Sequence, residues 1–63
     1  MCELKVVIDQ KLVFENAVYA KTVGNKVVVK GIMGELKEFS NYAIAEVNIA
    51  NEQLVLSPTI TQN

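Results

Sequence analysis

Residues 17–32, AVYAKTVGNKVVVKGI, decide the fold of this chain. Two runs rich in valine flank the pair Gly24-Asn25. A two-residue turn between such runs is typical of a β-hairpin, and glycine supplies the positive φ that the turn requires. A tight turn predicts three cross-strand pairs: Val23 with Lys26, Thr22 with Val27, and Ala20 with Val29. The face that carries Val27 and Val29 is then the expected core face.

The rest of the chain has the composition and spacing of further short strands. Ten valines and five isoleucines stand against five leucines, and β-branched side chains favour strands over helices. Apolar residues alternate with polar ones between turn residues, in runs at residues 3–8, 11–14, 35–39, 44–49 and 53–57. The pair Glu15-Asn16 is expected to break the pattern, and Ser40-Asn41 to form either a turn or the cap of a short helical turn. These runs predict an all-β fold: a small antiparallel barrel or curled meander of five to six short strands, SH3-like or Sm-like in size.

The length of 63 residues allows one domain. We assign residues 1–57 to a single β domain and residues 58–63 to a polar C-terminal tail, since Pro58 cannot donate to a strand ladder. A chain this short is marginally stable alone and commonly needs a metal, a disulfide or a second subunit. The single cysteine excludes an internal disulfide. Val7 and Val28 fall on the outer faces of their strands, which favours a homodimer formed through those faces.

Several function classes are disfavoured by composition. No apolar run exceeds four residues, too few for a membrane helix or a secretory signal, and a lone cysteine is typical of a cytoplasmic protein. Six lysines face seven acidic residues, with no arginine and no histidine. Nucleic-acid-binding domains usually carry a basic excess, and histidine is the commonest acid–base catalyst and metal ligand. We therefore expect no enzyme, no membrane partner and no nucleic-acid partner.

Cys2 is the residue best placed for chemistry. It lies beside the chain's α-amine, so thiolate and nitrogen can chelate one metal ion whether Met1 is removed or retained. Thiolate with amine or amide nitrogen in a plane suits Ni(II) or Cu(II). The competing interpretation is that Cys2 is a small apolar residue at the start of a strand. If carboxylates were the ligands instead, Glu3 and Glu46 would be the candidates.

Other residues allow a different function, a small β-barrel RNA-binding or protein-interaction module without metal. Lys21, Lys26 and Lys30 could meet phosphates on one hairpin face. Tyr19, Tyr42 and Phe39 could stack on bases, although core or rim packing is the simpler interpretation. Glu35 and Glu38 could form a carboxylate pair, but on a strand they would point to opposite faces.

The chain resembles the CooT family of small microbial proteins over nearly its whole length. The Met1-Cys2 start is the specific motif, and strand and turn patterns carry the rest. The matching segments are MCELKV at residues 1–6, GNKVVV at 24–29, GELKE at 34–38, IAEV at 44–47 and LVL at 54–56.

The resemblance implies a nickel-binding accessory protein for the maturation of carbon monoxide dehydrogenase. It further implies a homodimeric β-rich fold in which Cys2 binds Ni(II), and only Cys2 is carried over as a ligand. Proteins of this family are also labelled RNA-binding. The expected partners are therefore a second copy of the chain and a client metalloenzyme.

Overall fold

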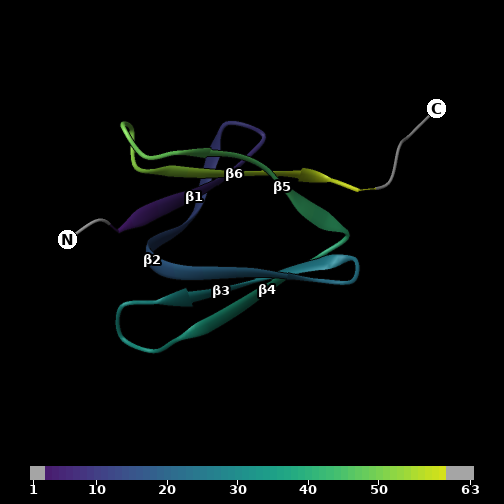
Figure 1. Ribbon diagram of the computed structural model, residues 1–63, viewed down its shortest axis with the longest axis horizontal. Coiled ribbons are helices and arrows are strands. Elements are labelled where there is room, and N and C mark those ends of the chain that lie inside the picture. The colour runs from purple at the N-terminus through teal and green to yellow at the C-terminus, as the bar shows by residue number, and fades with distance from the viewer. Residues whose placement is uncertain (1–2, 60–63) are drawn as a thin grey trace.

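The computed structural model describes residues 3–59, which form six strands and no helix (Figure 1). The strands are β1 (Leu4–Ile8), β2 (Lys11–Val23), β3 (Lys26–Gly31), β4 (Leu36–Ser40), β5 (Tyr42–Asn48) and β6 (Gln53–Pro58). They make one sheet in the order β4-β3-β2-β1-β6-β5. The all-β class and the six strands confirm the prediction. Within residues 3–59, no helix is long and apolar enough to cross a membrane.

The sheet is mixed and is not closed into a barrel, so the predicted antiparallel barrel or meander is wrong in topology. β1 and β6 run parallel, while every other neighbouring pair is antiparallel. β4 and β5 follow one another in the chain but lie at opposite edges of the sheet. The sheet nevertheless curls, since β5 lies against β3 without being its neighbour. Alternation along the sequence specifies which face of a strand is apolar, but it does not specify which strands pair over long distances.

The β2–β3 hairpin has the predicted register. Gly24 has a φ of 60°, as turns with a positive φ at the first central position require. Val27 lies opposite Thr22 and Val29 lies opposite Ala20. Val27 and Val29 are both fully buried, which confirms the predicted core face.

β2 is one strand of 13 residues, where the sequence predicted a break. Between the pairs Leu4–Ala17 and Val6–Phe14, β1 advances two residues while β2 advances three. Asn16 lies in this bulge with a φ of 61°, a conformation that asparagine adopts more readily than most residues. The bulge bends β2 without ending it, so its first half pairs with β1 and its second half with β3.

Asn41 forms the corner between β4 and β5, where a helical turn was one of the expectations. Its φ is 67°, and β5 begins at the next residue. The Asn41 N–H donates to the Asn25 carbonyl oxygen at 2.6 Å, and its own carbonyl accepts from the Thr59 N–H at 2.9 Å. These bonds connect the corner to the β2–β3 turn and to the end of β6. The helical alternative is therefore wrong.

The core lies on the concave face of the curled sheet. Its buried members come from four strands: Val6, Ala17, Val27, Val29, Leu54 and Leu56. Partly buried side chains that include Phe14, Phe39, Tyr42 and Ile44 pack against them. β1 pairs with β2 on one side and with β6 on the other, so the chain from Leu4 onward is built into the sheet next to the core.

Candidate metal centre

The predicted metal ligand, Cys2, lies outside the described residues. The structure does describe the segment to which Cys2 is joined: Glu3 is half-buried, and Leu4 begins β1. The structure therefore describes the surroundings of a candidate metal centre from residue 3 onward.

Hydrogen bonds and strand pairing hold the start of β1 on both sides. Leu4 lies opposite Ala17 of β2, and Ala17 in turn lies opposite Gly31 of β3. On the other side, the Lys5 N–H donates to the Glu52 carbonyl oxygen at 2.8 Å. The backbone at the start of β1 is therefore held in a fixed position.

Exposed apolar residues occur in the segments next to this position. Val18 follows Ala17 in the chain, and the Ile32 N–H donates to the carbonyl of Asn16 at 2.9 Å. On the other side, the Ile49 carbonyl accepts from the Glu52 N–H at 3.1 Å. Val18 and Ile32 are each 46% exposed, Val47 is 53% exposed and Ile49 is 60% exposed. We call Val18, Ile32, Val47 and Ile49 the amino-terminal surface.

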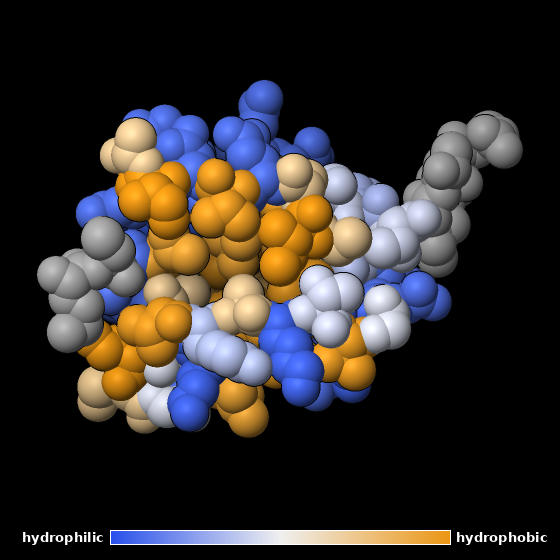
Figure 2. Space-filling view, in the orientation of Figure 1, coloured by the Kyte–Doolittle hydropathy of each residue, from blue (hydrophilic) through white to orange (hydrophobic). Residues whose placement is uncertain are grey.

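The space-filling view shows apolar side chains gathered in a band between β5 and β2 (Figure 2). Val47 lies opposite Leu54, on the core side of β5, but stays half exposed. The sheet is open along this edge, so its inner face reaches the solvent there.

The alternation of apolar and polar residues did not predict the position of Val47 in this surface, because β5 contains a bulge. Ile44 lies opposite Leu56 and Val47 opposite Leu54, with an irregularity between Ile44 and Glu46. The bulge places two apolar residues three apart on the same face, which strict alternation assigns to opposite faces. The spacing of three between Ile44 and Val47 is the feature of the sequence from which this bulge could have been predicted.

Val7 and Val28, whose outer faces the sequence favoured for a subunit contact, are less exposed than the amino-terminal surface. Val7 and Val28 are both half-buried. Val28 lies in a row between Lys21 and Glu38. Val7 lies between Leu12 and Val55, over a shallow depression that Lys5, Gln10 and Gln53 also line.

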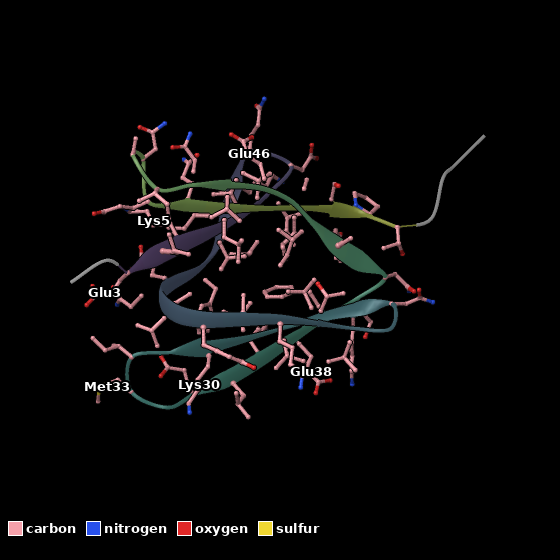
Figure 3. All side chains as sticks on the ribbon, in the orientation of Figure 1. Glu3, Lys5, Lys30, Met33, Glu38 and Glu46 are labelled. Atoms are coloured by element: carbon pink, nitrogen blue, oxygen red, sulfur yellow. The ribbon has the colours of Figure 1, made fainter. Side chains whose placement is uncertain are left out.

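The carboxylates do not gather into a site. Among residues 3–59, no three His, Cys, Asp or Glu side chains are close enough to hold a metal ion. Glu46 lies opposite Val55 on the outer face of the sheet, and Figure 3 shows Glu46 at the top of the view, by β5, and Glu3 at the left, ahead of β1. Within the described part of one chain, Glu3 and Glu46 are therefore not members of such a cluster.

Glu35 and Glu38 each have their own partner and do not form a pair. The Glu35 carboxylate accepts from the Met33 N–H at 3.0 Å and lies over Gly31, in the space that a β-carbon there would need. Glu38 bonds the Lys26 ammonium at 3.2 Å. The first closes a turn, and the second is an exposed ion pair between strands.

The lysine-rich hairpin face is only partly available for phosphates. Lys26 is engaged by Glu38, which leaves Lys21 and Lys30 as the free cations among the three predicted. Tyr42 and Phe39 pack against the core, so Tyr19, 50% exposed, is the one predicted stacking residue on the outer face.

The fold and its start define a class: a small all-β protein whose single cysteine stands two residues before a strand that is paired on both sides. The chain belongs to the family described as CO dehydrogenase accessory protein CooT, whose model matches residues 1–57. That description gives the family a role accessory to CO dehydrogenase. No curated protein matches the chain.

Proposed function

We propose that this protein binds Ni(II) through Cys2 and supplies it during the maturation of carbon monoxide dehydrogenase. The observation that carries the proposal is a cysteine two residues before a fixed strand, in a chain of a CO dehydrogenase accessory family. The lone cysteine favours action in the cytoplasm.

The chemistry of the available donors supports nickel. The chain has no histidine and one cysteine, so its only thiolate ligand is at position 2. A thiolate with amine or amide nitrogen suits Ni(II) and Cu(II) better than hard cations. The choice of nickel over copper in this proposal rests on the resemblance to the CooT family.

The donor count further supports a homodimer. One chain start supplies one thiolate and few nitrogens. Two starts related by a two-fold axis supply two thiolates and two nitrogens, which is enough for a closed four-coordinate site. The expected stoichiometry is half an equivalent of nickel per chain.

Nickel titration of the metal-free protein tests the ligand assignment. We expect thiolate-to-nickel absorption bands that saturate near half an equivalent per chain and are lost in Cys2→Ser. Glu3→Gln and Glu46→Gln are the matched controls and should bind nickel like the parent. Undiminished nickel binding by Cys2→Ser would contradict the proposal.

Transfer to the client is a separate test. Nickel-loaded protein mixed with nickel-free carbon monoxide dehydrogenase should raise its activity faster than the same total of free nickel in the presence of a competing chelator. Cys2→Ser should give no such advantage. Equal rates of enzyme activation by the nickel-loaded parent protein and by free nickel would show that the protein binds nickel but does not deliver it.

A further inference from the structure

We infer that the outer face of β2, β3 and β4 docks the client enzyme, through a segment of that enzyme that carries acidic side chains beside apolar ones. The inference rests on the accessory role proposed above, and it names the docking surface and the chemistry of its partner. The strand registers place nine side chains on this face in three rows: Tyr19 with Lys30 and Leu36, Lys21 with Val28 and Glu38, and Val23 with Lys26 and Ser40. We call these nine residues the hairpin outer face.

The first row of this face is apolar at both ends and highly exposed. Leu36 is 67% exposed and Tyr19 is 50% exposed, with Lys30 between them. Met33, in the turn after β3, is 86% exposed, and Figure 3 shows Met33 and Lys30 together in the lower part of the view. Within residues 3–59, Met33 and Leu36 are the two most exposed large apolar side chains. Clustered exposed apolar side chains mark interaction sites, and tyrosine and methionine are enriched at protein interfaces.

The hairpin outer face is positively charged, although the chain as a whole is not. Its three lysines and one glutamate sum to +2. The whole chain carries −1, which leaves −3 on the other residues. Lys26 pairs with Glu38 at 3.2 Å, and within the described residues no ion pair engages Lys21 or Lys30. A partner with complementary charge therefore presents carboxylates to Lys21 and Lys30.

The mixture of charged and apolar groups favours a protein segment over a nucleic acid. Single-stranded nucleic acids are bound by basic side chains together with aromatic platforms, and Tyr19 is the only aromatic side chain of the face. Leu36 and Met33 gain little from phosphates, whereas burial against another protein removes their apolar area from water. A second copy of this chain fits poorly, because a two-fold contact places the same face on both sides and would oppose +2 with +2.

The position of the face in the sheet suits the client enzyme as the partner. Leu4, the first residue of β1, lies opposite Ala17, and Ala17 lies opposite Gly31. The next pair along β2 and β3 is Tyr19 with Lys30. A protein docked on the first row of the hairpin outer face therefore lies close to the start of β1.

Binding to immobilised, nickel-free carbon monoxide dehydrogenase tests the inference. We expect Leu36→Ser to weaken binding at least tenfold, and Lys30→Glu to slow association and to reduce its dependence on salt. Leu12→Ser and Lys11→Glu are the matched controls, because Leu12 is 49% exposed and both residues lie in the half of β2 that pairs with β1. Both controls should bind the enzyme like the parent. Circular dichroism checks folding, and Met33→Ser provides a second apolar variant if Leu36→Ser does not fold.

Nickel titration of the same variants separates this inference from the proposed function. Leu36→Ser and Lys30→Glu should bind nickel like the parent. Equal binding of the enzyme by the parent and all variants, or no binding by the parent, would overturn the docking surface and leave nickel binding through Cys2 standing. A parent that binds no nickel, but binds the enzyme in a manner that Leu36→Ser weakens, would overturn the nickel proposal and keep the surface. Binding of single-stranded RNA at low salt that is lost in Lys30→Glu, with enzyme binding unchanged, would assign the face to nucleic acid instead.

Discussion

At the residue scale, single side chains in left-handed or crowded positions hold the turns. Glu35 is the clearest case, since its carboxylate occupies the space above Gly31 and accepts the Met33 N–H. A glycine at position 31 is needed there because a β-carbon would collide with the carboxylate, and not because of an unusual φ.

Gly31→Ala should therefore destabilise the protein by displacing Glu35. A lost exposed hydrogen bond costs about 0.5–1.5 kcal/mol, so we expect a loss of about 1 kcal/mol in the free energy of unfolding. In a Glu35→Ala background the same change should cost much less, because no carboxylate remains to be displaced. Denaturant unfolding of the four proteins measures this coupling. Equal costs in both backgrounds would contradict the account.

The pH dependence of nickel affinity is also set at single groups. Free thiols and α-amines have pKa values of about 8.5 and about 7.7–8.0, so both hold protons near neutrality. Metal must displace those protons, and affinity should rise with pH. We expect at least a tenfold increase between about pH 6.5 and 8, measured by competition in a buffer that does not bind nickel. A flat profile would indicate carboxylate ligands.

At the element scale, bulges and corners decide what the sequence could and could not predict. The hairpin at Gly24 was predictable to the residue because its turn chemistry is local. The bulge at Asn16 was not, because asparagine there fits either a strand break or a bulge, and only pairing with two different strands decides between them. The corner at Asn41 could not be predicted either, because its hydrogen bonds to Asn25 and Thr59 join segments distant in sequence.

Asn41 should tolerate glycine and reject a β-branched residue. Its φ of 67° lies in the left-handed region, which costs most side chains about 1–2 kcal/mol and β-branched ones more. Asn41→Val should lower the free energy of unfolding by at least about 1 kcal/mol, whereas Asn41→Gly should change it little. Thermal unfolding of the two variants provides the comparison. Equal stability of both would show that the corner does not depend on this conformation.

At the scale of the whole molecule, an open curled sheet leaves part of its inner face uncovered. The sequence predicted a marginally stable chain and a second subunit to compensate, with the contact on the outer faces of Val7 and Val28. It could not find the amino-terminal surface because that surface is assembled from β2, the turn after β3, and β5. Cys2 itself was predictable as a candidate ligand from its position beside the amine, without any structure.

Native mass spectrometry of the nickel-loaded protein tests the central claim most directly. We expect a species of two chains with one nickel ion, accompanied by a shift from monomer toward dimer when nickel is added. Cys2→Ser should give no nickel-bound dimer under the same conditions. Nickel retained by Cys2→Ser, or one nickel ion on each isolated chain of the parent, would contradict a shared site built on Cys2.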